Sequence, residues 1–312
     1  MKGIGIIAMI VGHSPIPKLL ESFIFVWHMP LFFLVSGYFY KSKSEAEYIK
    51  RNARQLVLPY ALTALVMIML TATKQLVIRK GDSMTMLISA MVGNGSGNNP
   101  IFSDYNIGAI WFLLAMFWCR SSYNILQVRI SNPLILGGAI LLLSIIATYV
   151  GTIIYLPTDI LEGAEALLFF YIGHMSHEND EVLKKIHISK WFILIVVLLT
   201  GLSIHAGSMS MVRCYYGYWP VNYLAAIGMT VMVYYLSKCL RGNRFLTWCG
   251  RVSMVILCVH IIELNFFPMG KFHEIIPFNN DSIDVFIHLS NGVLFSWIIL
   301  RLRFVKRLFS IA

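Results

Sequence analysis

The chain has 312 residues, of which 58% are hydrophobic and only 13% are charged, and its mean hydropathy is +0.72. This composition excludes a soluble globular domain and predicts a polytopic membrane protein. The net charge of +10 does not indicate nucleic-acid binding, because the basic residues are spread over short clusters between apolar stretches. We therefore predict an all-α fold, a bundle of about ten transmembrane helices that forms one domain over residues 1–312.

Apolar stretches long enough to cross about 30 Å of hydrocarbon recur along the chain. The predicted helices cover residues 2–14, 22–40, 56–78, 107–127, 133–150, 160–175, 190–206, 218–238, 247–266 and 283–303. The first is short, since Gly3 to Gly12 spans only about 15 Å before Pro15 and Pro17 interrupt it. It is either a half-span supported by its neighbours or part of a helix whose natural start lies upstream, and we favour the second.

The distribution of Lys and Arg predicts the orientation of the bundle. With both termini in the cytoplasm, 19 of the 25 basic residues fall on the cytoplasmic side, as the positive-inside rule requires. The six that fall outside are Lys18, Lys74, Arg79, Lys80, Arg213 and Lys271. We expect an integral membrane protein with both termini in the cytoplasm, in contact with membrane lipids, with a long outer loop from Arg79 to Asn106.

The five cysteines predict neither disulfides nor a metal centre. Only Cys214 falls in a predicted outer loop, so no partner is available for an extracytoplasmic disulfide. The sequence contains no CxxC and no His/Cys cluster with metal-ligand spacing. No metal site is expected.

Lys2 and His13 are the strongest candidates for function. Eleven residues at about 100° each make three turns plus roughly 20°, so the two side chains align on one stripe of a helix, about 16 Å apart along its axis. Ionisable residues inside an apolar helix are costly, and they are therefore functional candidates by default. The plainer alternatives are an interfacial histidine and a lysine that extends to the membrane surface.

Further polar candidates lie in the second, sixth and ninth predicted helices. His28 precedes Pro30, which frees a backbone carbonyl, so His28 is a candidate for substrate contact or for a hydrogen bond to the backbone. His260 and Glu263 are three residues apart on one helix face and form either a site or a mutually satisfied pair. Glu162 and Glu165 have the same spacing and are candidates to bind the hydroxyls of a substrate or to be solvated.

Two candidates have strong packing alternatives. Ser36 precedes Gly37, and small neighbouring residues are typical of close helix contacts in membranes. Trp111, beside Phe112, is a candidate for substrate binding or an interfacial or packing aromatic residue.

The motifs around these residues resemble the acyltransferase 3 family, in its fucose-4-O-acetylase-like or WecH-like branch. The resemblance covers most of the chain in order. Its motifs are Lys2-Gly3-Ile4-Gly5-Ile6 with Gly12-His13-Ser14, His28-Met29-Pro30-Leu31-Phe32-Phe33 with Ser36-Gly37-Tyr38, Ala109-Ile110-Trp111-Phe112-Leu113, Leu168-Phe169-Phe170-Tyr171-Ile172-Gly173, and Phe245 to Ser253 leading to His260. The family usually has Arg or Lys eleven positions before its His, which Lys2 matches, whereas Leu168 replaces a usual Pro.

The resemblance implies a protein of the bacterial cytoplasmic (inner) membrane. It also implies transfer of an acyl group, commonly acetyl from acetyl-CoA, onto a sugar hydroxyl of an envelope polysaccharide or lipid-linked sugar. Acyl-CoA is then a donor substrate, and no permanently bound cofactor is expected. A sugar hydroxyl needs a base to react at neutral pH, and a neutral imidazole can supply one. His13 is the candidate general base or acyl relay, and Lys2 the candidate contact for the CoA phosphates.

Two other classes of protein have similar compositions. A secondary transporter also has many apolar helices with buried ionisable residues, but its halves repeat, and the Trp27 to Pro30 run has no counterpart in the second half. A non-catalytic membrane scaffold would not need the aligned Lys2 and His13.

Overall fold

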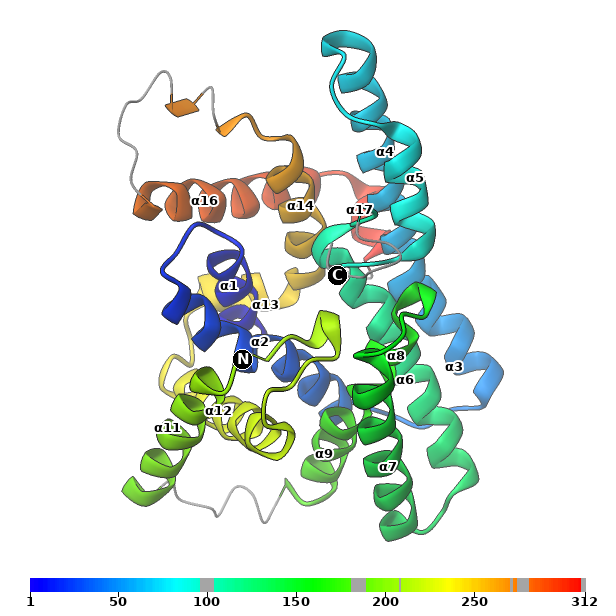
Figure 1. Cartoon of the computed structure of the whole chain (residues 1–312), viewed down its shortest axis with the longest axis vertical. Coiled ribbons are helices and arrows are strands. Elements are labelled where there is room, and N and C mark those ends of the chain that lie inside the picture. The colour runs from blue at the N-terminus through cyan, green and yellow to red at the C-terminus, as the bar shows by residue number, and fades with distance from the viewer. Residues whose placement is uncertain (96–103, 181–188, 208, 270–271, 274–280, 310–312) are drawn as a thin grey trace.

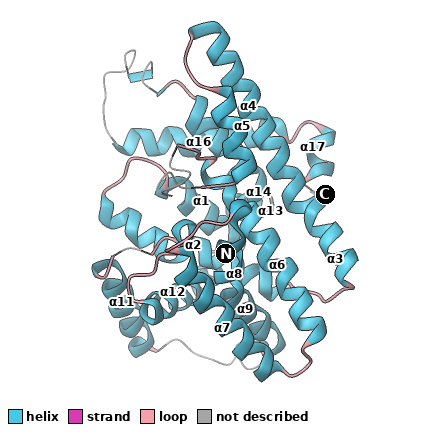
Figure 2. Cartoon of the chain, turned by 45° about the vertical axis from the view of Figure 1, so that its right-hand side comes forward, coloured by secondary structure: helices cyan, strands magenta, loops and turns pink. Residues whose placement is uncertain are grey.

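A computed structural model describes residues 1–95, 104–180, 189–207, 209–269, 272–273 and 281–309. Every regular element of these residues is a helix, apart from an isolated antiparallel bridge between Ser210 and Tyr215. The all-α prediction is therefore confirmed for the described part of the chain. In both views of the fold, α4 (Leu58–Ile78) and α5 (Ser83–Val92) run side by side at one end, while α11 (Lys190–His205) and α12 (Trp219–Cys239) lie together at the other (Figures 1 and 2).

The described residues contain further α-helices. They are α1 (Lys2–Gly12), α2 (Lys18–Tyr38), α3 (Glu45–Asn52), α6 (Trp111–Arg129), α7 (Pro133–Gly151), α8 (Ile160–Glu165), α9 (Leu167–Glu178), α13 (Arg244–Arg251), α14 (Ser253–Phe266), α16 (Asp281–Ile299) and α17 (Arg303–Leu308).

Several of these helices are long and apolar enough to span a membrane. Among the described residues, α2, the continuous helix Glu45–Ile78, α7 and α16 meet this condition, and the bent pair α13 and α14 makes a fifth if it is counted as one span. α1 has only 11 residues, the short helix expected before Pro15. The predicted count of ten spans stays a prediction, as does an upstream start.

The helix boundaries differ from the sequence prediction at three breaks in regular α-helix. The span predicted at 56–78 begins at Glu45 and passes through a π turn, Ala53–Val57, ahead of Pro59, which has no N–H to donate to the preceding turn. The span predicted at 160–175 is split at Ala166 into α8 and α9. The span predicted at 247–266 bends by 78° at Val252.

The segment predicted as a loop from Arg79 to Asn106 contains a helix, α5, and the loop prediction is wrong for Ser83–Val92. Asp82 caps the start of α5, accepting a hydrogen bond from the Met84 N–H. Gly93 ends it with φ +84°, a left-handed conformation that glycine adopts without strain. Gly97, part of the same predicted loop, lies outside the described residues.

α2 and α9 cross at two glycines that face each other's backbones. A Cβ at Gly37 would lie 2.0 Å from the Phe170 carbonyl oxygen, and one at Gly173 would lie 2.0 Å from the Leu34 carbonyl oxygen. Only glycine permits this approach, so the close-packing interpretation of Gly37 is confirmed. The crossing holds the carboxyl-terminal end of α2 against α9.

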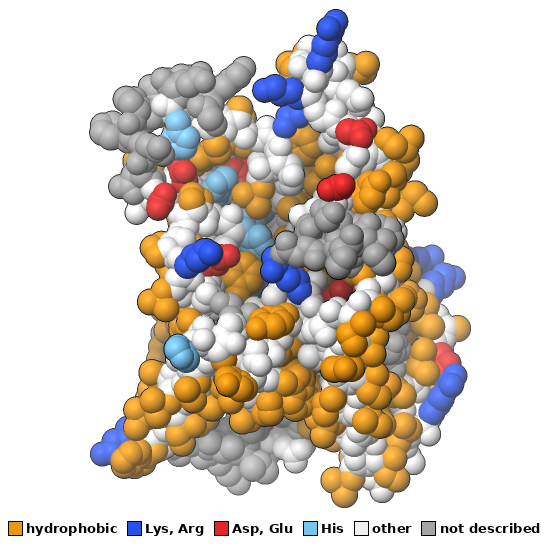
Figure 3. Space-filling view, in the orientation of Figure 1, with side chains coloured by type: hydrophobic (Ala, Val, Ile, Leu, Met, Phe, Trp, Pro, Cys, Tyr) orange, Lys and Arg blue, Asp and Glu red, His pale blue; other side chains and the backbone are white. Residues whose placement is uncertain are grey.

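Large apolar side chains cover much of the outer surface. Leu76 on α4 and Leu134 on α7 are each 84% exposed, and many other large apolar residues are exposed as well. Figure 3 shows apolar side chains over the lower part of the visible face, with charged side chains gathered mainly toward its upper end and edges. An apolar surface of this extent is favourable in lipid and costly in water, which agrees with a membrane protein.

Candidate active site

His13 lies at the carboxyl end of α1, as its C-cap residue. Its backbone N–H donates to the Met9 carbonyl at 3.1 Å, and its ring Nδ1 lies 2.8 Å from the same oxygen. A carbonyl can only accept, so the contact assigns the ring proton to Nδ1. The other nitrogen, Nε2, then carries the lone pair of a base.

His28 on α2 is held in the same way. Its Nδ1 lies 2.9 Å from the Ile24 carbonyl oxygen, which confirms the predicted backbone hydrogen bond, although Pro30 does not free that particular carbonyl. Its Nε2 is fully buried and has no hydrogen-bond partner among the described residues. The centroids of the His13 and His28 rings are 6.4 Å apart, and both rings pack against Phe25.

α14 and α16 bring a carboxylate to the same place. Nδ1 of His288 lies 2.8 and 3.0 Å from the two carboxylate oxygens of Glu263, and the Asn291 amide donates to Oε1 at 3.2 Å. Nδ1 of His260 lies 3.3 Å from Oε2 of Glu263, within ion-pair distance but without hydrogen-bond geometry. The Glu263 side chain is 1% exposed, so its neighbours, and not water, stabilise its charge.

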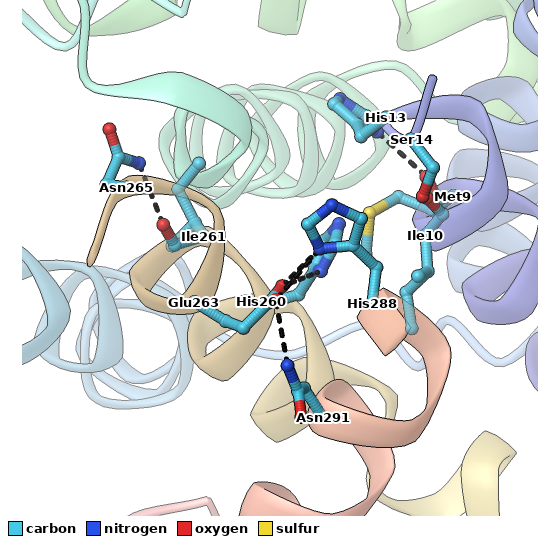
Figure 4. A network of polar contacts seen from close by, with 10 residues as sticks. All are labelled: Met9, Ile10, His13, Ser14, His260, Ile261, Glu263, Asn265, His288 and Asn291. Carbon is cyan, nitrogen blue, oxygen red and sulfur yellow. Dashed lines mark hydrogen bonds and ion pairs between the residues drawn. The ribbon is translucent and has the colours of Figure 1, made fainter. Parts of the chain in front are cut away.

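Four helices therefore converge on one group of imidazoles, the histidine cluster, made of His13, His28, His260 and His288. The His260 ring centroid is 6.3 Å from that of His13 and 6.1 Å from that of His288. Figure 4 shows the rings of His13, His260 and His288 turned toward a shared space between α1, α14 and α16. Among the described residues, no group of three or more His, Cys, Asp or Glu has an arrangement that could hold a metal ion.

A narrow cavity of about 120 Å³ leads toward the cluster between α1, α2, α6 and α14. Lys2, Ile6 and Met9 line it in succession along one face of α1, and His13 is the next residue on that face. On α14 the lining reaches Leu257, one turn before His260. The cavity therefore joins the Lys2 end of α1 to the turn below the histidine cluster.

Ser36 and Arg120 also line this cavity, together with Ser253. Gly5 packs against Leu31, and Gly12 packs against Ile24. α2 therefore runs antiparallel to α1, and Ser36 falls near the level of Lys2. Lys2 is exposed and also lines a second, wider cavity of about 600 Å³ between α2, α9, α11 and α12.

Three predicted site residues lie outside this arrangement. Glu162 and Glu165 are on α8 and are buried, so they are not solvated, and both carboxylate oxygens of Glu165 have no hydrogen-bond partner among the described residues. Trp111 is buried against Gly95, where a Cβ would lie 2.2 Å from the indole, which agrees with its packing interpretation. None of the contacts described for these residues reaches the histidine cluster.

The sequence analysis missed His288, Asn291 and Arg120. His288 and Arg120 are ionisable residues in apolar helices, the same signal that drew attention to His13. Asn291 carries no such signal, since its role depends on α16 meeting α14.

Comparison with known proteins identifies the class of the chain. Residues 1–301 match the acyltransferase domain family. Because this match covers nearly the whole chain, the protein belongs to the acyltransferase 3 family. It is therefore a membrane acyltransferase. Searches of curated proteins and of solved structures gave no match.

Proposed function

We propose that this protein moves an acyl group, acetyl in the simplest case, from acyl-CoA to a sugar hydroxyl of an envelope polysaccharide or glycolipid. The observation that carries the proposal is the cavity that begins at Lys2 and ends one turn below the histidine cluster. A thioester donor is a long chain with phosphates at one end and the reactive carbonyl at the other. A narrow cavity with a cationic end and a basic end matches that order of groups.

His13 is the general base in this proposal. Its Nε2 takes the proton from the sugar hydroxyl as the hydroxyl oxygen attacks the thioester carbonyl carbon. The C–S bond breaks as the new ester C–O bond forms, and the CoA thiolate leaves. The proton on His13 then passes to that thiolate, which restores the neutral imidazole and releases CoA as its thiol.

A covalent relay uses the same atoms in a different order. Nε2 of His13 attacks the thioester first and forms an acyl-imidazole, with CoA leaving as a thiolate. The sugar hydroxyl then takes the acyl group from the imidazole, and its proton goes to a neighbouring base. Nε2 of His28, whose ring centroid is 6.4 Å from that of His13, can take that role.

Glu263 and His288 do not contact the substrate in this proposal. They are positioning residues for His13 and His260. A carboxylate that accepts from Nδ1 of an imidazole fixes its tautomer and stabilises the cation if the ring is protonated. Glu263 does this for His288 and lies within ion-pair distance of His260. The buried carboxylate of Glu263 thereby supports a positive charge on either of these two rings.

We infer from the charge distribution on which side of the membrane the donor and the acceptor bind. With both termini in the cytoplasm of a bacterial cell, the donor reaches Lys2 from the cytoplasmic side. The acceptor glycan approaches from the opposite side, near the segment that contains α5. The acyl group then crosses part of the membrane inside the bundle.

The proposal is tested with purified protein in liposomes. Acetyl-CoA labelled in its acetyl group is added with glycolipids extracted from bacterial membranes, and the label in the glycan is measured by mass spectrometry. We expect label in an alkali-labile ester only when protein and acetyl-CoA are both present. Label that stays on CoA, with a wide panel of envelope glycans and correctly folded protein, would contradict the proposed reaction.

A further inference from the structure

A line of ionisable side chains continues from the histidine cluster toward the amino end of α16. Asp284, His288 and Asn291 are spaced by four and then three residues, so they share one face of that helix. His288 and Asn291 both hydrogen-bond to Glu263, which turns this face toward α14 (Figure 4). Asp284 therefore lies one helical turn from His288, in the direction of the exposed Asp281.

His273 pairs with Asp284 at the end of this line. Nε2 of His273 lies 3.2 Å from Oδ1 of Asp284, and the two side chains are 25% and 13% exposed. The side chains of His260 and Glu263, by contrast, are 0% and 1% exposed. The exposed fraction thus rises from the histidine cluster to His273, so this pair is where the line reaches water.

Several polar atoms on the line are buried and have no hydrogen-bond partner among the described residues. They are both ring nitrogens of His260, Nδ1 of His273 and Oδ1 of Asp284. Buried polar atoms are costly unless water or another polar group satisfies them. Water that satisfied these atoms would also connect the groups by hydrogen bonds, and an imidazole passes a proton along such a connection because it can both accept and donate one.

The side of the cluster that faces the narrow cavity is less favourable for a proton. Among the described residues that line this cavity, the only ionisable ones are Lys2 and Arg120, and the wall between them and the cluster is apolar. Two positive charges repel a proton, and an apolar wall offers no base to accept it. Asp284, on the α16 side, is a carboxylate that attracts one. Charge therefore directs a proton from the cluster past Asp284, away from Lys2.

We propose that His288, Asp284 and His273 carry a proton from the histidine cluster to the outer side of the membrane. The inference rests on the proposed acyl transfer in its covalent-relay order, and on the orientation inferred from the charge distribution. The cluster then loses one proton to the outer solution in every turnover. Asp284 acts through the imidazoles and contacts neither donor nor acceptor.

The steps balance in atoms and charge. CoA leaves His13 in the first step as a thiolate, which takes a proton from the cytoplasm. In the second step the sugar oxygen attacks the acyl carbon, the bond from that carbon to Nε2 of His13 breaks, and the ester C–O bond forms. The hydroxyl proton passes to a neighbouring imidazole of the cluster and leaves through His288, Asp284 and His273. One proton is consumed inside and one is released outside for each acyl group transferred.

The helices packed against α16 present further titratable groups among the described residues. α1 presents His13, with Lys2 at its opposite end, and α14 presents His260 and Glu263. At the carboxyl end of α14, the Lys74 ammonium of α4 donates to the Asn265 carbonyl. Most of the groups that titrate near neutral pH on this line are therefore imidazoles. Acid on the outer side adds protons to them and removes the base that the reaction needs.

Proteoliposomes with separately buffered inner and outer solutions test the route, with labelled acetyl-CoA supplied to the cytoplasmic face of the protein. Lowering the pH at the opposite face from about 7.5 to about 5.5 should slow acyl transfer at least about fivefold, because protonated imidazoles cannot accept the hydroxyl proton. The same change at the CoA face should alter the rate by less than about twofold. A rate that follows only the pH at the CoA face would overturn the proposal.

Asp284→Asn should slow transfer by about tenfold or more and leave CoA binding unchanged, because an amide cannot take up a proton. Asp284→Glu should recover part of the rate. Added imidazole should do the same for Asp284→Asn, since a small diffusible base can carry the proton in place of the carboxylate. The matched control is Asp281→Asn on the same helix, an exposed carboxylate that water can replace, which should change the rate by less than about twofold.

A folded Asp284→Asn protein with the wild-type rate and pH response would overturn the role of Asp284, and so would a slow one that imidazole does not rescue. If Asp284→Asn does not fold, as judged by thermal melting, His273→Gln carries the same test.

A spectroscopic measurement separates this proposal from the proposed reaction. NMR of isotope-labelled histidine rings in the same liposomes reports protonation without any substrate, and His288→Asn identifies the His288 signals. The His288 ring should follow the pH at the outer face. If it does so in a protein that fails to acylate glycans, the route stands and only the proposed function fails. Protonation that follows the pH at the CoA face would overturn the route alone.

Discussion

Glu263 and His288 form a hydrogen-bonded pair, 2.8 Å from Oε1 to Nδ1, that joins α14 to α16 inside the bundle. The pair makes Glu263 the carboxylate that the histidine cluster shares, because His260 lies 3.3 Å from its other oxygen. The charge of this carboxylate, and not only its shape, is what a positioning role requires.

Glu263→Gln should therefore slow acyl transfer by about tenfold or more while CoA binding is retained. Glutamine keeps the size but can present an N–H to His288, which disturbs the tautomer that the carboxylate imposes. Initial rates and the pH profile of transfer should be measured on the same preparations. Glu263→Asp should recover part of the rate, and Glu178→Gln, an exposed carboxylate, is the control. A glutamine variant with wild-type rate and pH profile would show that Glu263 is only structural.

Lys2→Ala should reduce the use of acyl-CoA, whereas Lys2→Arg should retain most activity. Phosphate recognition needs a cation at this position, and Arg supplies one. The apparent affinity for acyl-CoA in the transfer assay checks this, at matched expression. Equal losses in the two variants would indicate a steric or folding role for Lys2.

The crossing of α2 and α9 predicts a stability effect far from any chemistry. Gly37→Ala and Gly173→Ala should each destabilise the protein by about 1–3 kcal/mol, since the new methyl group meets a backbone carbonyl that cannot move alone. Gly138→Ala and Gly201→Ala are matched controls on α7 and α11, where nothing lies within 4 Å of the new Cβ. Thermal unfolding in detergent provides the measurement. Similar melting temperatures for all four variants would contradict the crossing.

The proposed orientation predicts which loops are reachable from outside the cell. Single cysteines at the exposed positions Ser44 and Lys80, on a cysteine-free background, should react oppositely with a membrane-impermeant thiol reagent in intact cells. Only the Lys80→Cys site should be labelled, because the positive-inside rule places residues 41–54 in the cytoplasm. The opposite pattern would invert the topology and remove a cytoplasmic donor from the account.

Helix periodicity predicts which residues share one face of a helix, and the sequence was sufficient for these alignments. The alignment of Lys2 with His13 and of His260 with Glu263 follows from spacing alone, and the structure has both on their expected helices. Periodicity does not say which faces meet. The approach of α14 to α1 and the meeting of His288 with Glu263 depend on contacts between distant segments, so neither was predictable.

The breaks in the helices were missed for a related reason. The 78° bend at Val252 and the split at Ala166 have no proline beside them, and a single nearby glycine, Gly250 or Gly163, does not by itself mark a break. By contrast, α5 carried signals that could have been used, an Asp82 cap and a terminal Gly93. α5 was not predicted because it is short and lies within a Gly- and Asn-rich segment.

The most direct test of the account is the rate of acyl transfer by His13→Gln. Glutamine keeps a hydrogen-bonding side chain but cannot take up a proton or carry an acyl group. The account predicts a loss of roughly 10²–10⁴-fold in glycan acylation, with normal folding and normal CoA binding. His205→Gln, an exposed histidine at the end of α11, should transfer acyl groups at the wild-type rate. Wild-type acylation by a well-folded His13→Gln protein would contradict the central claim that His13 is the base or relay.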